Sequence, residues 1–222
     1  MKRANGRPAK RLGRPRSFDR DAALERAIEV FWRHGYEATS VSDLTAAMDI
    51  NPPSLYAAFG DKEHLFLEAV ERYQRRRGDT MRKVFSDAPT ARAAIEQFLA
   101  VAAAELACST HPRGCMLELS AATCSADSAH VHSVLAESRA AARSFLKTRI
   151  DRAVREGELP RGTDTAALTD FYTTVLQGMS IQAREGATRK SLLATAATAM
   201  RAWPAGGGPA SRRRSTSAEK ST

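Results

Sequence analysis

Three cysteines and three histidines fall within 25 residues of the 222-residue chain, and their side chains are the ligands that soft metal ions prefer. They are Cys108, His111, Cys115, Cys124, His130 and His132. The tightest group is Cys108-x2-His111-x3-Cys115. Gly114 and Cys115 occupy a turn into a predicted helix, where the helix dipole can lower the pKa of a thiol. Two interpretations follow: a metal- or thiol-sensing site centred on Cys115, or small apolar core cysteines, which are buried more often than they react.

The N-terminal arm offers a different chemistry, because it carries a dense positive charge. Residues 1–20 hold eight Lys and Arg against one Asp, a net charge of +7, whereas residues 21–203 together carry −1. A basic arm on a nearly neutral body favours a polyanionic partner, since each neutralised phosphate releases condensed counterions. Gly and Pro in the stretch Gly13-Arg14-Pro15-Arg16 keep the arm thin, so we expect Arg14 and Arg16 to enter a minor groove of DNA.

Both ends of the chain are predicted to be disordered. Residues 1–17 form the basic arm, and residues 204–222 are rich in Gly, Ser and Pro without apolar periodicity. Most charge runs are simply solvated ends, and the tail fits that interpretation.

Between the arm and residue 66, the chain has the pattern of consecutive short helices. Asp19 is a good N-cap for a helix in which apolar residues recur at i, i+3, i+4 and i+7 from Leu24 to Phe31. Gly35 stands where the C-terminus of this helix needs a left-handed residue. The first helix is therefore expected to end immediately before a turn.

A helix, a tight turn and a second helix follow. Ser40 and Asp43 resemble a capping box that opens the first of the two. Asp49 lies in the turn, where Asp tolerates a left-handed conformation better than most residues. Asn51 caps the second helix, and Pro52 suits its first position because that N–H would be unpaired anyway. Such a helix-turn-helix places its second helix in the major groove of DNA.

Residues 18–66 resemble the DNA-binding domain of the TetR/AcrR family of one-component transcriptional regulators. The matching residues are Phe31 and Gly35-Tyr36, Thr39-Ser40-Val41 with Leu44, Ser54-Leu55-Tyr56 with Phe59, and Lys62-Glu63 with Leu65. The resemblance implies a homodimer whose recognition helices sit in successive major grooves of a palindrome, and an effector in the C-terminal domain that releases the DNA. The chain departs from the family pattern at Asp49, where Gly is usual, and at Pro52-Pro53, where a basic residue and Gly are common.

The candidate DNA contacts lie on the two helices and at the start of the next one. The residues expected to contact base edges are Ser42, Pro53 and Ser54. Those expected to contact phosphates are Ser40, Tyr56 and Lys62. The dipole of the helix that begins at Lys62 adds attraction for an anion. Two of these residues have simpler explanations, because Tyr56 is also compatible with a half-buried core aromatic and Ser40 with a cap alone.

The rest of the chain is predicted to be helical as well, with a long helix from Asp61 towards Phe85. Further helices are expected at 91–107, 114–124, 127–157, 164–186 and 189–203. Apolar stripes on the last two suit a dimer surface, although an intramolecular core explains such stripes equally well. Helices within 91–186 are expected to line an apolar pocket for an organic effector, so residues 67–203 are assigned to effector binding and dimerisation.

Composition and missing motifs exclude other classes of protein. The chain lacks a Gly-rich phosphate loop after a strand, a nucleophile elbow and a His-Glu-x-x-His pattern, so no enzyme, cofactor or metal site is assigned. The start of the chain lacks the apolar stretch of a signal peptide, and no run of about 18 apolar residues exists. Three cysteines do not make a disulfide framework. We therefore expect a cytoplasmic protein without a membrane partner.

The sequence thus predicts an all-α protein with an N-terminal three-helix helix-turn-helix DNA-binding domain and a C-terminal helical ligand-binding and dimerisation domain. Its expected function is to repress transcription from a double-stranded DNA operator until a small-molecule effector binds. Two alternatives stay open. One is a copper- or electrophile-responsive regulator that uses Cys115, with Cys108, His111 and Cys124 as further candidates. The other is a non-specific architectural DNA binder that works through its Gly-Arg-Pro arm.

Overall fold

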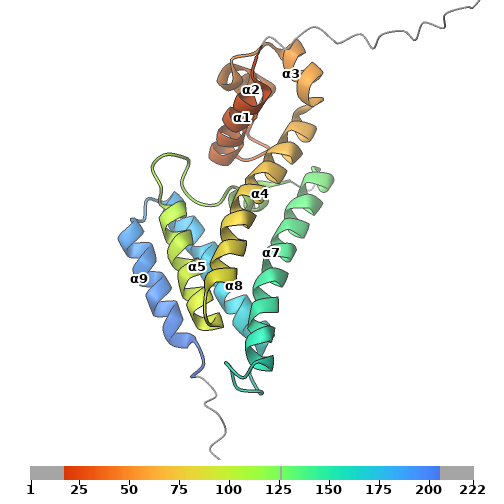
Figure 1. Cartoon of the computed structure of the whole chain (residues 1–222). Coiled ribbons are helices and arrows are strands. Elements are labelled where there is room, and N and C mark those ends of the chain that lie inside the picture. Colours follow the sequence, from red (N-terminus) through yellow and green to blue (C-terminus); the bar gives the residue numbers. More distant parts are fainter. Residues whose placement is uncertain (1–17, 126, 206–222) are drawn as a thin grey trace, which may run out of the picture.

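The computed structural model describes residues 18–125 and 127–205, which form nine α-helices, one 3₁₀ turn and no strand. The prediction of an all-helical fold is therefore confirmed over this part of the chain. Three helices gather at one end of the molecule (Figure 1). They are α1 (Arg20–His34), α2 (Val41–Met48) and α3 (Pro52–Phe59). The basic arm with Arg14 and Arg16 lies outside the described residues, as do residues 206–222.

The N-terminal helices begin at the residues that the sequence predicts. The Asp19 carboxylate accepts two backbone N–H groups of the first turn of α1. Ser40 and Asp43 form both halves of the capping box of α2, and the Asn51 side chain accepts the backbone N–H of the third residue of α3 at 2.9 Å. Asp49 has φ 54° and ψ 48°, so it takes the left-handed position of the turn without a glycine.

A closely packed core holds these helices against the next one. Phe31 of α1 is fully buried and meets Phe66 edge to face, with ring centroids 5.0 Å apart. Arg20 fixes the end of α3, because its guanidinium lies over the Phe59 ring at 4.4 Å and donates to the Ala58 carbonyl. The same guanidinium donates to the Glu68 carboxylate at 2.6 Å. The exposed face of α3 is thereby held in a defined orientation.

One long helix joins the two halves of the molecule. Helix α4 (Lys62–Asp87) starts beside α3 and runs down into the larger helical group, where it lies alongside α7 (Figure 1). The predicted domain boundary at residues 66 and 67 falls inside this continuous helix. A change at the lower end of α4 can therefore reach α3 without crossing a flexible linker.

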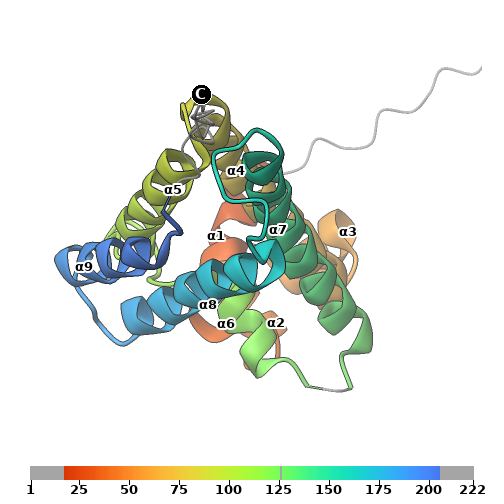
Figure 2. The ribbon, with the colours of Figure 1, turned by 90° about the horizontal axis from the view of Figure 1, so that it is seen from below.

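Five further helices complete the larger group. They are α5 (Ala91–Leu106), α6 (Met116–Thr123), α7 (Ala129–Arg155), α8 (Thr165–Arg184) and α9 (Arg189–Ala199). Helix α8 crosses next to α6, and α9 packs on the outer side against α5 and α8 (Figure 2). No helix of the described residues combines the length and apolarity that crossing a membrane requires.

The predicted helix at 189–203 is shorter than expected. Helix α9 ends at Ala199, and the 3₁₀ turn η1 (Met200–Ala202) follows it. The Trp203 N–H donates to the Met200 carbonyl at 3.2 Å, which tightens the last turn in the way common at helix C-termini. The Trp203 ring then packs against Tyr172 of α8, with centroids 5.8 Å apart.

Candidate nucleic-acid interface and ligand cavity

The outer face of α3 presents polar and aromatic groups that no neighbour occupies. Tyr56 is 51% exposed, and its hydroxyl forms no hydrogen bond with the described residues. Pro53 is exposed nearby on the same helix, while Ser54 is half-buried and its backbone N–H donates to the Asn51 side chain. Leu55, one residue earlier than Tyr56, faces the core and is fully buried. The phase of the helix thus turns Tyr56 towards solvent.

Ser42 completes this surface from the neighbouring helix. It is exposed in the first turn of α2, which packs against α3. Its side chain forms no hydrogen bond with residues 18–125 or 127–205, so the hydroxyl is available to a partner. Tyr56, Pro53 and Ser42 are therefore the predicted DNA contacts that the fold leaves accessible and unengaged.

Ser40 and Lys62, in contrast, already have partners within the protein. The Ser40 hydroxyl donates to the Asp43 carboxylate at 2.6 Å and accepts the Asp43 N–H. The Lys62 ammonium donates to the carbonyls of Tyr36 and Thr39 at 3.1 Å each and lies 4.3 Å from the centre of the Tyr36 ring. Both side chains therefore hold the loop before α2 in place.

The cysteine and histidine candidates do not converge on a common site. Among the described residues, no three His, Cys, Asp or Glu side chains are arranged to hold a metal ion. Cys108 lies next to Thr110, whose hydroxyl lowers the pKa of the thiol, and burial raises the pKa of Cys124. His111 stacks on Trp32 at 4.5 Å. Of the four candidates, Cys115 alone lines the cavity described next.

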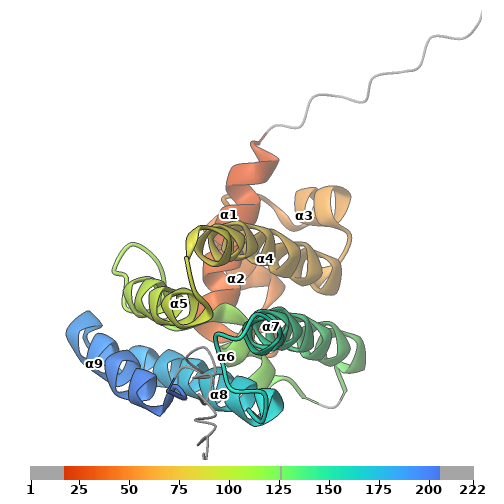
Figure 3. The same cartoon turned by 60° about the horizontal axis from the view of Figure 1, so that its bottom comes forward.

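A cavity of about 810 Å³ lies between α4, α5, α6, α7 and α8, the helices seen together in Figure 3. The cavity lies where the sequence predicts an effector pocket within 91–186, and α4 also supplies one wall of it. Much of its lining is apolar, including Met81, Phe85, Phe98, Leu106, Leu146 and Leu176. Its volume falls within the range of roughly 300–1,000 Å³ that is typical of small-molecule sites.

A buried polar cluster occupies the end of the cavity near Cys115. The Arg77 guanidinium donates to the Tyr73 hydroxyl at 2.9 Å, and the Met116 N–H donates to the same oxygen at 3.3 Å. The Tyr73 oxygen lies 3.7 Å from the Cys115 sulfur. Burial raises the pKa of Tyr73 well above its ordinary value, so this hydroxyl stays protonated.

The same end of the cavity is in contact with the DNA-binding helices. The Trp32 indole N–H of α1 donates to the Gly114 carbonyl at 3.2 Å, and the Trp32 ring meets Tyr73 edge to face at 5.0 Å. Gly114 has φ +85°, and a Cβ there would lie 2.9 Å from the Ser180 carbonyl oxygen. Only glycine allows the backbone to come this close to Ser180 of α8. The loop at Gly114 therefore contacts both α8 and Trp32 of α1.

The sequence interpretation had overlooked Arg77, Tyr73 as a polar group, and Trp32. The position of Arg77 could have been predicted from the helical repeat, because it follows Tyr73 by four residues and so lies on the apolar stripe of α4. Its neighbours Arg75 and Arg76 in the same basic run are exposed. Burying a charged side chain costs free energy, so a charged residue on the buried face of a helix indicates a specific partner at that position.

Two known domain families match consecutive parts of the chain. Residues 23–69 match the bacterial regulatory proteins of the tetR family, and residues 89–201 match the tetracyclin repressor-like C-terminal domain. The chain is 37% identical over 196 residues to the HTH-type transcriptional repressor ComR of Escherichia coli (strain K12), which covers 88% of this chain and 93% of that protein. It is 31% identical over 192 residues to the HTH-type transcriptional repressor BdcR of the same organism, covering 84% and 90%.

Solved structures point the same way. The TetR family transcriptional regulator CifR, as a cysteine mutant complexed with 26bp double-strand operator DNA, matches with a TM-score of 0.83 and 44% identity. This match covers 86% of the present chain and 100% of the CifR chain. The chain therefore belongs to the TetR family of bacterial regulatory proteins and is a helix-turn-helix transcriptional repressor rather than an enzyme.

Proposed function

We propose that this protein binds a palindromic DNA operator as a homodimer and leaves it when an organic effector fills the cavity. Residues 18–66 would read the DNA, and residues 67–203 would bind the effector and form the dimer. The observation that carries the proposal is the single rigid helix α4, which starts beside the exposed face of α3 and forms a wall of the cavity. By linkage, the operator must weaken effector binding by the factor by which the effector weakens operator binding.

The proposed DNA contacts follow the free groups on the α2–α3 surface. Ser42, Pro53 and Ser54 face base edges, and the Tyr56 hydroxyl donates to a phosphate. Pro53 also presents a rigid apolar surface that can pack on a thymine methyl. The likeness to the operator-bound CifR structure supports this orientation of α3.

Two further groups are assigned to the phosphate backbone. Ser40 and Lys62 remain candidates for contact with a phosphate. The Lys62 ammonium has three N–H groups and uses two of them within the protein, so one is left for a phosphate oxygen. Arg14 and Arg16 of the arm are proposed to enter an adjacent minor groove.

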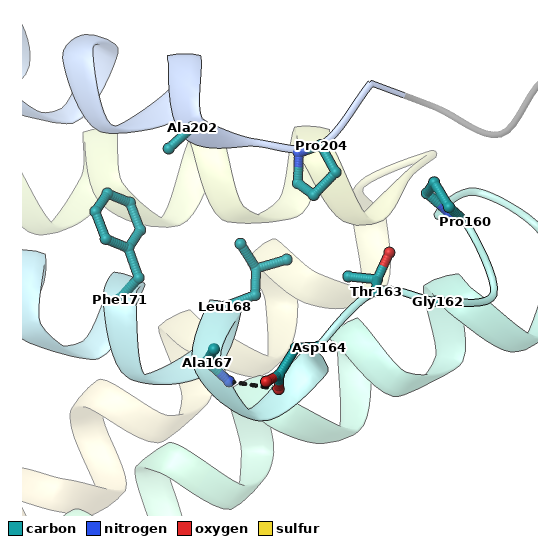
Figure 4. Close-up of a pocket in the computed structure, with 9 residues that line it drawn as sticks. All are labelled: Pro160, Gly162, Thr163, Asp164, Ala167, Leu168, Phe171, Ala202 and Pro204. Carbon is teal, nitrogen blue, oxygen red and sulfur yellow. Dashed lines mark hydrogen bonds between the residues drawn. The ribbon is translucent and has the colours of Figure 1, made fainter.

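An uncovered apolar face of α8 supports the proposed dimer. Phe171 is 39% exposed and Ile181 is 53% exposed, ten positions apart on one side of the helix, and Gly178 lies between them with open space around it. Phe171 also lines a shallow hollow between the start of α8 and the segment with Ala202 and Pro204 (Figure 4). A dimer that reads a palindrome must hold its two recognition helices about 34–36 Å apart, the distance between successive major grooves.

We expect Ile181→Glu to convert the dimer to a monomer, because it would place like charges opposite each other across the interface. Sedimentation velocity measures the change. Ala47→Glu on the exposed face of α2 is the control and should sediment like the wild type. Ala197→Glu on α9 tests the second helix, since Ala197 is exposed whereas Ala196 is 5% exposed and belongs to the protomer core. Unchanged dimers in both Ile181→Glu and Ala197→Glu would place the interface elsewhere.

The DNA-binding part of the proposal is tested by selecting duplexes from a random pool and footprinting the winner. A two-fold symmetric site is the expected result. Protection of A·T-rich DNA without symmetry would indicate the architectural binder instead, because such a protein reads groove shape rather than half-sites.

A thiol switch at Cys115 is the second candidate for the signal, since its sulfur lines the cavity and lies beside Tyr73. Titration of the protein–operator complex with Cu(I), and separately with an electrophile, distinguishes it from a reversible ligand. Release that disappears in Cys115→Ser would establish the switch. Release by neither reagent leaves the organic ligand.

A further inference from the structure

We propose that the effector is an amphipathic organic acid, whose anionic group is held by Arg77 and Arg139 and whose apolar body fills the cavity. The inference rests on the proposed function, because it names the chemical class of effector for the same cavity. Four arginines line that cavity, and they differ in what satisfies their charge.

Two of the four have carboxylate partners outside the cavity. Arg82 pairs with Asp79 one turn earlier on α4, and Arg143 of α7 donates to Asp170 of α8 at 2.5 Å. Their charges are therefore compensated without a ligand. They also provide matched controls, since they border the same space.

Arg77 and Arg139 form no ion pair with any residue that the structure describes. The one hydrogen bond of Arg77 goes to the neutral Tyr73 hydroxyl. The Nε atom of Arg139 is buried and has no hydrogen-bond partner. A buried guanidinium N–H without an acceptor costs free energy, because the group has lost its water and gained nothing in exchange. An anion in the cavity would supply an acceptor for Arg139 Nε and an opposite charge for Arg77. The two side chains come from α7 and α4, which both line the cavity.

Glu118 of α6 lines the same space and is the obvious internal competitor. It forms no ion pair with the described residues either. Burial raises the pKa of its carboxyl, against the opposing influence of Arg139 and the Gln177 amide. Its surroundings thus favour the neutral carboxyl more than water does, and it forms no ion pair with either guanidinium group. In its neutral form it can also donate a hydrogen bond to a ligand oxygen.

The other end of the cavity determines the rest of the ligand. Phe85 meets Phe98 at 5.8 Å and Phe145 at 5.1 Å between ring centroids, and Met81 and Leu146 continue this wall. Such a surface favours an apolar and preferably aromatic body. A guanidinium binds a carboxylate or sulfonate through paired hydrogen bonds, which would orient that body towards the phenylalanines.

The anion site also lies next to the contacts with the DNA-binding helices. Arg77 holds the Tyr73 hydroxyl, and the Tyr73 ring packs on Trp32 of α1. A ligand that draws the Arg77 guanidinium towards itself would disturb this packing. Binding of the acid and release of the operator can therefore share one set of side chains.

A pair of fluorescent probes that differ mainly in charge tests the proposal on the full-length protein. Anilinonaphthalene sulfonate carries the anion, and N-phenyl-naphthylamine has the same rings without it. We expect the wild type to bind the anionic probe more tightly. Arg139→Gln should weaken that probe about tenfold, which corresponds to about 1.4 kcal/mol, and leave the neutral probe unchanged.

Arg77→Gln should have the same selective effect, and Arg143→Gln should have none. Arg139→Gln is the safer variant, because Arg139 bonds to nothing within the described residues and its loss should not unfold the protein. Displacement of the sulfonate by decanoate but not by decanol would extend the result to carboxylates. Equal affinity for the two probes, or full affinity for the anionic probe in both Arg77→Gln and Arg139→Gln, would overturn the proposal.

Operator binding is measured on the same samples without any probe. If a neutral ligand fills the cavity and releases the operator as well as the anionic one does, the repressor function stands and the organic-acid class fails. If no symmetric operator is bound at all, the proposed function fails, whatever the probes do.

Discussion

At the upper end of α4, side chains of opposite charge meet one another, whereas two guanidinium groups face the cavity at the lower part of the helix without a carboxylate partner. Arg72 reaches Glu25 of α1 at 2.6 Å, and Arg20 of α1 reaches Glu68 of α4. Arg77 lies only five residues beyond Arg72 and has no such partner among the described residues. The DNA-binding end thus pairs its charges within the fold, while the cavity end holds two guanidinium groups that have no carboxylate partner among the described residues.

The DNA-binding end is also packed more tightly than the cavity end. The helices around α3 enclose a core in which Phe31, Leu44 and Leu55 are fully buried. The helices around the lower part of α4 enclose an open volume, and Phe85 and Phe145 remain partly exposed along it. A region that must present a fixed surface to DNA gains from dense packing, and a region that must accept a ligand cannot be filled by its own side chains.

The largest expected effect compares one phenylalanine from each region. Phe31→Ala should lower the free energy of unfolding by about 3–5 kcal/mol, because it leaves a void in a closed core. Phe85→Ala only enlarges an existing cavity and should cost roughly half as much or less. Urea denaturation of both variants measures the two losses. Similar losses would contradict the contrast in packing.

A smaller change tests the surface of the DNA-binding end. Tyr56→Phe removes one exposed hydroxyl and should weaken operator binding about tenfold, the effect of one hydrogen bond to a charged phosphate oxygen. Fluorescence polarisation with the selected operator measures it. The free energy of unfolding should not change, since the hydroxyl has no partner within the described residues. Full affinity in Tyr56→Phe would remove this residue from the proposed contacts.

The contact between the two regions is tested at Trp32. Trp32→Phe keeps an aromatic ring but loses the hydrogen bond from the indole N–H to the Gly114 carbonyl. We expect a loss of about 1 kcal/mol in the free energy of unfolding. The release of operator caused by a cavity ligand should also become smaller. Unchanged release in a correctly folded Trp32→Phe protein would show that this hydrogen bond plays no part in the coupling.

The smallest effect concerns a surface link between the regions, from Glu37 to the loop before α7. Hydrogen bonds from Ser128 and Ser125 lower the pKa of the Glu37 carboxyl below its usual value. A lowered pKa in the folded state stabilises the protein above the usual pKa of about 4.3, and this contribution is lost as the pH falls through the lower folded value. The stability of wild type relative to Glu37→Gln should therefore be constant near neutral pH and shrink in acid. A difference that grows on acidification would contradict the assignment.

The positions of the N-terminal helices could be predicted from the sequence because their determinants are local. Asp19, Ser40 and Asn51 cap the helices that follow them through side chains one turn away. The left-handed turn at Asp49 and the outward phase of Tyr56 depend on the same short-range geometry. These features need no knowledge of distant parts of the chain, and the resemblance to a known family rests on them.

The internal contacts of Lys62 and the placement of the cysteines could not be predicted in this way. Lys62 reads as a free cation at a helix start, yet carbonyls 23 and 26 residues away occupy its ammonium group. Cys108, His111 and Cys115 are close in sequence, but the backbone turns between them and directs only Cys115 into the cavity. Spacing limits how far apart two residues can lie, and it does not determine which way their side chains point.

The sequence alone therefore determined the helical fold, the helix-turn-helix and its exposed face, because capping, apolar periodicity and turn preferences act over a few residues. Tertiary structure decided what lines the cavity and which charges stay uncompensated. Arg82 finds its carboxylate partner three residues away on its own helix, whereas Arg77 and Arg139 line one cavity only because α4 packs against α7. Arg77 and Arg139 are more than fifty positions apart in the sequence, so the whole fold sets the distance between them.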